Sequence, residues 1–242
     1  MPLRISKILS KPNNLIKFFA EEHLLGTIPS PIPAQKMLPQ YFQKILPQTD
    51  SHPQSSTVKR CVPFLEASSA GYIIPFWTDV LVVARDGDLR IEFPQNAPIS
   101  QSLGQHDYNQ IEHHPLSKKP YGNLPLKWIN PWGIETPKGW SVLITQPLNH
   151  LETRFKLLDG VVDTDEYYNQ INFPFLWTGG DGEFYIPQGT PLAQVIPFQR
   201  QSLEMEVCVE DVEKRMRTTS KINSVFRHGY RRKIWHKLRD SK

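Results

Sequence analysis

Three histidines and an aspartate lie close together in the least regular part of the chain, and they are the first candidates for chemistry. His106, Asp107, His113 and His114 all fall between residues 94 and 127. Imidazole and carboxylate groups suit iron, zinc or manganese. His106 and Asp107 are adjacent, however, and lack the spacer of a His-x-Asp pair. His113 and His114 would point to opposite faces of a strand. We therefore expect exposed loop histidines here and predict no metal site.

The C-terminal segment, residues 211–242, combines basic and aromatic side chains. It holds eleven Lys and Arg residues against three Asp and Glu, in a chain whose formal net charge is +4. Such a pattern can hold phosphates and stack on bases, so nucleic acid is one possible partner. The same pattern can dock on an acidic protein surface, with large side chains as anchors. We favour protein docking through Phe226, Tyr230, Arg231, Arg232 and Trp235.

The central segment, residues 134–199, alternates strand-like runs with turn signals and predicts a compact antiparallel β unit. Pro137-Lys138 predicts a turn at which the chain doubles back. Asp159-Gly160 predicts a hairpin or a bulge, and Asp86-Gly87, earlier in the chain, predicts a hairpin. The prolines of the central segment exclude a long helix.

The N-terminal 57 residues predict an extended arm with short helices. One helix is expected from Asn13 to Leu25 and another from Ala34 to Leu46. The proline-rich stretch between them must be extended. The β region then begins at residue 58. Its predicted strands are Lys59–Leu65, Tyr72–Trp77, Val80–Ala84, Leu89–Phe93 and, at its end, Leu203–Val209.

The fold class that follows is mainly β. We predict a distorted antiparallel β-barrel or jelly roll at residues 58–210, with an N-terminal arm at 1–57 and a short helical, basic tail at 211–242. The 22 prolines against 13 glycines suit a β protein with long ordered loops. Two cysteines far apart offer no metal spacing. No apolar run approaches the length of a membrane span, so we expect no membrane contact.

Three segments within about residues 128–200 resemble those of dUTPases and dCTP deaminases. Gly160–Tyr167 is similar to their Gly-x-Ile-Asp-x-Asp-Tyr segment, and Gly189–Ile196 to their Gly-x-x-x-Ala-Gln-x-Ile segment. Ile134–Ile144 resembles the strand pair that precedes both. The resemblance implies a β-clip type barrel, often trimeric, with nucleotide sites between subunits. It also implies Asp163 as general base, a chemically reasonable role for a carboxylate held by a turn.

The same resemblance implies that Gln194 contacts phosphate or an ordered water, and that Tyr167 packs on the deoxyribose, with Mg²⁺ as cofactor. The sequence departs from these enzymes at several of these points. Glu166 intervenes, so Tyr167 comes one position late, which in a strand means the opposite face. Thr145–Asn149 stands where the dUTPases have Arg-Ser-Gly, and the C-terminal segment 221–242 has one glycine where theirs is rich in glycine. The catalytic Glu and the Arg-Ser-rich segment of the dCTP deaminases have no clear counterpart either.

The whole layout also resembles uncharacterised proteins of about this length from tailed phages. The shared marks are Lys-Trp-Ile-Asn-Pro-Trp at 127–132, Gly-Val-Val-Asp-Thr-Asp at 160–165 and Gly-Thr-Pro-Leu-Ala-Gln at 189–194. This resemblance implies a non-enzymatic structural or accessory component of a virion, such as a capsid decoration protein or a connector. Its place would be the virion or the host cytoplasm. Its partners would be its own copies and other assembly proteins, and it would need no cofactor.

A dUTPase-like enzyme that binds or hydrolyses a nucleotide is the alternative function. The two functions differ in what they require of the carboxylates. An enzyme needs Asp163 exposed in a cleft beside cationic groups, whereas a structural protein predicts Asp163 and Asp165 in the hydrogen bonds of a turn.

Overall fold

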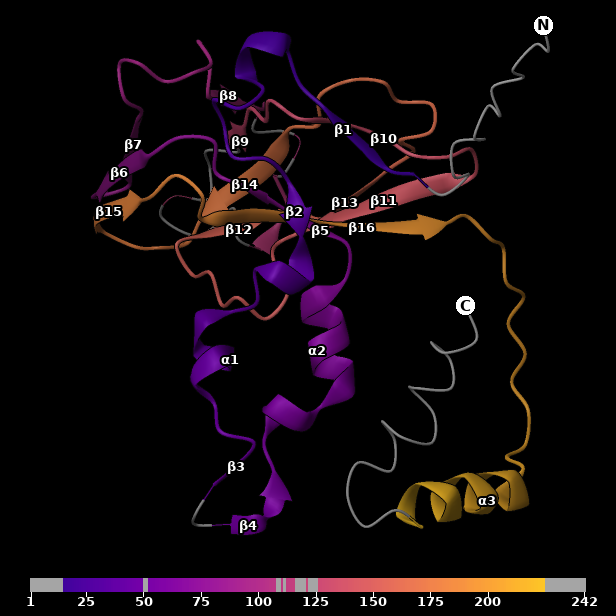
Figure 1. Cartoon of the computed structure of the whole chain (residues 1–242). Coiled ribbons are helices and arrows are strands. Elements are labelled where there is room, and N and C mark those ends of the chain that lie inside the picture. The colour runs from indigo at the N-terminus through magenta and orange to yellow at the C-terminus, as the bar shows by residue number, and fades with distance from the viewer. Residues whose placement is uncertain are drawn as a thin grey trace, which may run out of the picture.

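The computed structural model describes residues 15–49, 52–107, 110, 112–115, 121 and 126–224, without the side chains of residues 49 and 52–56. Strands dominate this part of the chain, and every strand pair within it is antiparallel (Figure 1). The predicted mainly β class is thereby confirmed. None of the helices within these ranges is long and apolar enough to cross a membrane.

The helical elements are few and short. The α-helices of the described residues are α1 (Gln40–Lys44), α2 (Val62–Ser69) and α3 (Val212–Asn223). Single 3-10 turns lie at Glu22–Leu24, Ala34–Lys36 and Val58–Arg60.

A five-stranded sheet carries the candidate site. Its strand order is β13-β11-β16-β5-β2, so its central strands come from distant parts of the sequence. In the register of β11 and β16, Leu143 lies opposite Ile196. The strands are β13 (Gly160–Val162), β11 (Trp140–Thr145), β16 (Pro191–Gln199), β5 (Tyr72–Pro75) and β2 (Ile32–Pro33).

Four smaller sheets lie in the rest of the described part of the chain. A four-stranded sheet contains β12 (Phe155–Leu157), β14 (Phe173–Trp177), β9 (Leu126–Trp128) and β8 (Leu103–Gln105) in that order. A three-stranded sheet contains β15 (Gly182–Ile186), β6 (Val80–Arg85) and β7 (Asp88–Glu92). Two strand pairs join β1 (Lys17–Phe19) to β10 (Gly133–Glu135), and β3 (Gln48–Thr49) to β4 (His52–Ser56).

Aromatic side chains fill the core between the sheets. The ring of Trp128 stacks on Phe175 with centroids 4.2 Å apart, and Phe76 and Phe155 meet it edge-on. Large rings bury much apolar surface and favour these stacked and edge-to-face geometries. Trp128 and Trp132, the two tryptophans of the segment 127–132, are both buried.

Two predictions for the first half of the chain are wrong. Within the described part of the expected helix Asn13–Leu25, the chain forms β1, which pairs with β10, and then a single 3-10 turn. The expected strand Lys59–Leu65 is instead a 3-10 turn followed by α2. Pro63 lies in the first turn of α2, where the missing N–H costs little. The hydroxyls of Ser68 and Ser69 donate to the carbonyls of Phe64 and Leu65, four residues back in the same helix.

Two of the three predicted turns are confirmed, at Asp86-Gly87 and at Pro137-Lys138, and only the first of them joins paired strands. Asp86-Gly87 links β6 to β7 as a hairpin, with positive φ at both residues, and this prediction is confirmed. The hairpin at Asp159-Gly160 is wrong, because β12 pairs with β14 and β13 pairs with β11. The turn at Pro137-Lys138 is likewise followed by a change of partner, since β10 pairs with β1.

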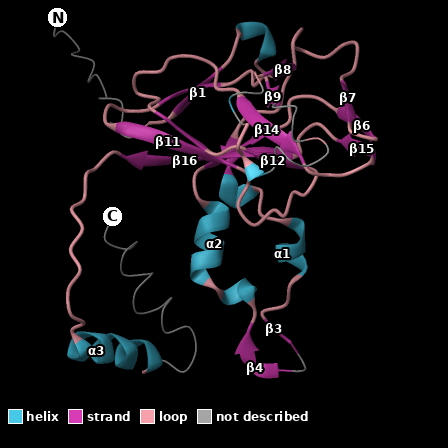
Figure 2. Ribbon diagram, turned by 180° about the vertical axis from the view of Figure 1, so that it is seen from behind, coloured by secondary structure: helices cyan, strands magenta, loops and turns pink. Residues whose placement is uncertain are grey.

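The chain beyond β16 leaves the sheets. Residues 201–210, called the arm below, run extended away from the β structure to α3, and Figures 1 and 2 agree on this course. The predicted strand Leu203–Val209 pairs with no strand in the described part of the chain, so in the single chain that strand is not formed.

Candidate functional site

The two candidate carboxylates lie in a tight turn directly after β13. The carbonyl of Asp163 accepts hydrogen bonds from the N–H groups of Glu166 (3.0 Å) and Tyr167 (2.9 Å). The hydroxyl of Thr164, buried between the two aspartates, lies 2.7 Å from that of Thr136. The turn is therefore fixed by its own main chain and by one buried side chain.

Asp165 is the buried member of the pair. Its carboxylate, 2% exposed, accepts the Gly139 N–H at 2.8 Å and is held by both terminal nitrogens of Arg200, one of them at 2.8 Å. A two-pronged guanidinium–carboxylate contact is among the stronger polar interactions in proteins. The bonds from Arg200, followed by that from Gly139, lower the pKa of Asp165 to about 2. The same contact raises the pKa of Arg200 above its usual value.

Asp163 is the exposed member of the pair. Its side chain is 63% exposed, and one carboxylate oxygen accepts the Ser141 hydroxyl at 2.6 Å and lies 3.2 Å from a nitrogen of Arg200. Arg200 also donates to the hydroxyl of Ser141 at 3.0 Å. Asp163 therefore belongs to a four-residue network with Asp165, Ser141 and Arg200, which we call the arginine latch.

Gln194 is fully buried, and main-chain groups surround its amide. The amide nitrogen donates to the carbonyls of Ala67 (3.1 Å) and Ala70 (2.7 Å), and the oxygen accepts the Leu148 N–H at 2.7 Å. Gln194 thus joins β16 to the end of α2 and to the loop after β11. Both donor hydrogens of the amide are engaged in this way.

The loop 145–149, where the resemblance places phosphate donors, lines a small surface hollow of about 210 Å³. Lys156 is the one permanent cation among the residues lining it. The Leu148 N–H, which a phosphate oxygen could accept, is taken by Gln194. Lys156 could therefore make one exposed contact with an anion, and the residues that line this hollow do not surround a phosphate with hydrogen-bond donors.

Tyr167 lies beside the turn with 46% of its surface exposed. The next residue, Tyr168, is 69% exposed and stacks on Phe19 of β1, with ring centroids 4.2 Å apart. The neighbouring tyrosine therefore has an aromatic partner within the chain, while Tyr167 presents its ring to solvent.

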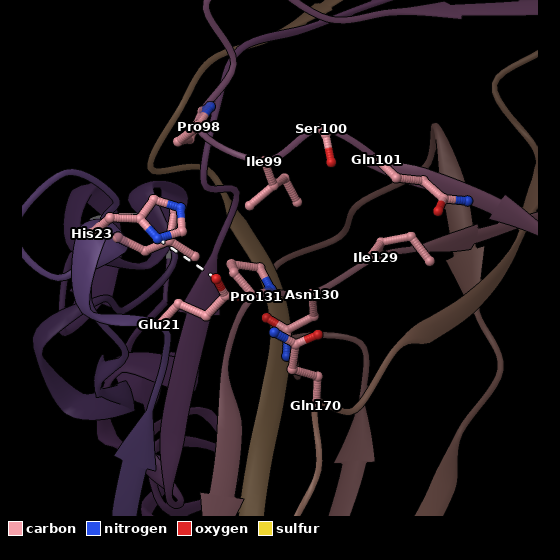
Figure 3. Close-up of a pocket in the computed structure, with 11 residues that line it drawn as sticks. Glu21, His23, Pro98, Ile99, Ser100, Gln101, Ile129, Asn130, Pro131 and Gln170 are labelled. Atoms are coloured by element: carbon pink, nitrogen blue, oxygen red, sulfur yellow. Dashed lines mark ion pairs between the residues drawn. The ribbon is translucent and has the colours of Figure 1, made fainter.

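A larger hollow of about 410 Å³ opens beside the 3-10 turn Glu22–Leu24, with Pro98, Ile129 and Gln170 in its wall (Figure 3). Glu21 and His23 form an ion pair of 3.6 Å at one side, and Ser100 and Gln101 face the opening. The Asn130 amide at its base is used internally, in bonds to main-chain groups of neighbouring residues. Among the lining residues only His23 can carry a positive charge, so this hollow does not fit a triphosphate.

A third hollow, of about 510 Å³, lies between α1 and the turn before β16. Burial lowers the pKa of His150 in its wall, so this imidazole is neutral at pH 7. Burial would raise the pKa of Glu152, but the bonds from Arg154 outweigh it and leave that pKa lowered. Asp163 lines neither this hollow nor the one in Figure 3.

The remaining candidates are the residues considered for a metal site and those predicted to dock a partner. Within the described residues, which include His106, Asp107, His113 and His114, no three His, Cys, Asp or Glu residues gather as a metal would require. Phe226, Tyr230, Arg231, Arg232 and Trp235 lie outside the described residues.

Sequence reasoning missed Ser141 and Arg200, the two partners of the carboxylates. Ser141 is the single polar residue in the apolar run 140–144, which is a sign of a specific contact. Arg200 directly follows the central segment, residues 134–199, with no local pattern that reveals its distant partner. Only the register of β11 with β16 brings it beside residues 163–165.

No protein-family model matches the sequence, and no curated protein matches it. Solved structures do show similarity, at low identity. A dUTPase mutant of Staphylococcus bacteriophage 80alpha, with dUpNHpp, has a TM-score of 0.38 and 10% identity over 81% of this chain and 97% of that one. A mutant dUTPase from phage phi11 of S. aureus has a TM-score of 0.35 and 12% identity, over 82% and 99%. The native dUTPase of EIAV has a TM-score of 0.32 and 13% identity, over 59% and 85%. This chain is thus similar in structure to dUTPases, two of them from phages.

Proposed function

We propose that this chain is a non-enzymatic structural or accessory component of a large assembly, of the kind that decorates or connects parts of a phage virion. The arm is the observation that carries the proposal. Its four apolar residues, Leu203, Met205, Val207 and Val209, are between 87% and 96% exposed. Contiguous apolar surface of this kind marks a place where a partner binds.

The geometry of the candidate site supports the same function. Asp163 and Asp165 hold Arg200, the residue from which the arm departs, and the main-chain N–H of Arg200 donates to Gly139 at 2.8 Å. The two carboxylates that the resemblance places in a nucleotide site thus contact Arg200 and fix the start of the arm. The amide of Gln194 is likewise engaged within the chain.

The virion assignment rests on the resemblance of three segments to proteins of tailed phages. Its test is mass spectrometry of purified particles of the phage whose genome encodes the chain. A structural component stays with the particles through density-gradient purification, at a fixed copy number per particle. Recovery of the chain only from the soluble lysate would contradict the assignment.

One observation favours a second candidate, a dUTPase-like hydrolase with Asp163 as general base. The Asp163 carboxylate is 63% exposed and lies beside a guanidinium, as a base near a phosphate site would. Such an enzyme would require Mg²⁺ and a nucleotide held between subunits, with Tyr167 as a further contact. Gln194, the other contact that the resemblance implies, is buried, and main-chain groups take its amide. Turnover of dUTP separates the two functions.

A further inference from the structure

We propose that residues 34–46, called the strap below, make an acid-sensitive contact with the rest of the chain, which opens when His150 takes up a proton. The strap joins β2 to β3 and contains α1. Together with the loop 147–152, which follows β11, it lines the hollow of about 510 Å³ described above. The contact lies within one chain, so the inference does not depend on the assembly function.

Two hydrogen bonds join the middle of the strap to this loop. The Tyr41 hydroxyl donates to the Asn149 carbonyl at 2.8 Å, and the His150 ring donates to the main-chain carbonyl of Met37. Leu151, the next residue of the loop, has φ +59°, and such a backbone persists where the surrounding contacts hold it. Loss of the His150 bond would therefore let both the loop and the strap move.

Other contacts fix the strap at its two ends. At the first end, the Ala34 N–H donates to the Gly71 carbonyl at 3.0 Å. At the second end, where α1 lies beside α2 (Figures 1 and 2), the buried Phe42 ring stacks on Phe64, and the Phe42 carbonyl accepts the Lys59 ammonium at 2.8 Å. A helix of five residues does not persist by itself in water. The middle of the strap, with the start of α1, thus depends on its contact with the loop.

The His150 ring is the group whose charge decides this contact. Its Nε2 atom is buried and has no hydrogen-bond partner within the described part of the chain, so Nδ1 is the nitrogen that donates to Met37. Neutral imidazole fits this arrangement, with one nitrogen as donor and the other as acceptor. Protonation would place a second N–H and a positive charge where no acceptor lies. A buried donor left without an acceptor is costly, and more so when it is charged.

The charged groups around the hollow do not offset that cost. Glu152 shares the hollow with His150, but both of its carboxylate oxygens accept bonds from Arg154, at 2.7 to 2.9 Å. The Tyr41 hydroxyl is itself a donor in this contact. Lys36, on the strap, is exposed and has the same charge as an imidazolium. The turn before β16 brings only uncharged residues to the wall.

The contact should therefore weaken in acid. The folded-state pKa of His150 lies below its ordinary 6.5, because burial penalises the charged ring. The contact is complete above about pH 6.5 and is lost progressively as the pH falls below that value. Between pH 7.5 and pH 5.0 one imidazole that stays neutral in the closed state can weaken the contact by at most about thirtyfold.

The test is hydrogen exchange of the full chain at pH 7.5 and pH 5.0, read by mass spectrometry and corrected for intrinsic exchange rates. Amide protection in residues 40–46 should fall about five- to thirtyfold at pH 5.0. Strand β11 is the internal reference, and its protection should stay the same. Equal protection of the strap at the two pH values, or a parallel loss in β11, would overturn the inference, and both can be judged on the wild type alone.

Three variants assign the effect to His150. His150→Gln should abolish the pH response of the strap, because an amide does not titrate. His23→Gln is the matched control, since this exposed imidazole pairs with Glu21, and it should keep the wild-type response. Tyr41→Phe removes the bond to Asn149 and should lower protection by the same factor at both pH values. A response that persists in His150→Gln, or disappears in His23→Gln, would contradict the role of His150.

Discussion

At the scale of residues, Arg200 decides what the carboxylate pair can do. It bonds to the buried Asp165 through both terminal nitrogens and lies 3.2 Å from Asp163. A base that takes a proton from water needs a lone pair free to face that water. One carboxylate oxygen of Asp163 is already shared between Ser141 and Arg200, so a water at the position that the dUTPase resemblance implies would have to face the second oxygen.

The pKa of Asp165 predicts a pH-dependent loss of stability. The folded-state pKa, about 2, lies below the ordinary 3.8, so the ionised carboxylate stabilises the fold above about pH 4. That contribution is lost as the pH falls toward 2. Asp165→Asn should therefore lower the urea midpoint at pH 7, and its difference from wild type should shrink between pH 4 and pH 2. A constant difference over that range would contradict the latch.

Asp163→Asn is the matched control for this experiment. An exposed ion pair contributes little to stability, so this variant should shift the midpoint at pH 7 less than Asp165→Asn does.

Gln194→Ala should destabilise the fold. The substitution removes the Gln194 bonds to the Leu148 N–H and the Ala70 carbonyl, at a cost of about 1–3 kcal/mol for each group left buried and unpaired, while the Ala67 carbonyl keeps the Ala70 N–H at 3.4 Å. Urea unfolding measures the change. Gln199→Ala, at the exposed end of the same strand, should change stability by less than about 0.5 kcal/mol. Equal losses in the two variants would show that the Gln194 amide does not join these segments.

The sequence alone could identify the carboxylates but not their partners. Asp163 and Asp165 belong to a short motif that begins with Gly160, and such a motif can be identified from a few consecutive residues. The residues that bond to that turn come from β11 and from the residue that follows β16. Contacts between segments so far apart in the chain cannot be predicted from the local sequence. Gln194 likewise stands in a short motif, Gly189–Ile196, that can be identified from the sequence. Its burial against the end of α2 cannot be predicted from the residues next to it in the chain.

At the scale of elements, strand positions were predicted better than strand partners. The runs that became β5, β6 and β7 were recognisable from their β-branched and aromatic residues. Asp159-Gly160 correctly indicates a break between two strands, but the chain passes there from one sheet to another instead of forming a hairpin. Pairing depends on burial of one face against distant strands, so short-range signals cannot specify it.

The close approach of α2's end to β16 makes Gly71→Ala a strong test of the packing between them. Gly71 has φ +65°, and an added Cβ would lie 2.0 Å from the Val195 carbonyl oxygen. The variant should lose more than about 3 kcal/mol of unfolding free energy, near the upper end for single substitutions. Gly26→Ala has a similar φ of +81° with nothing within 4 Å, and should lose only about 1–2 kcal/mol. Similar losses would show that β16 does not approach so closely.

At the scale of the whole molecule, the β structure holds its own core, while the arm and α3 extend from it (Figure 2). The sequence predicts a strand at Leu203–Val209, because apolar residues alternate there with mostly acidic ones. What the sequence could not show is that no strand of the described chain accepts it. An amphipathic strand without a partner is understandable in a subunit that completes its packing in an assembly.

The measurement that tests the central claim most directly is pyrophosphate release from dUTP in the presence of Mg²⁺. For a structural subunit, we predict no release above the level of a matched Asp163→Asn variant. Release by the wild type that falls about 10²–10⁴-fold in Asp163→Asn would identify a general base at work and contradict the structural account.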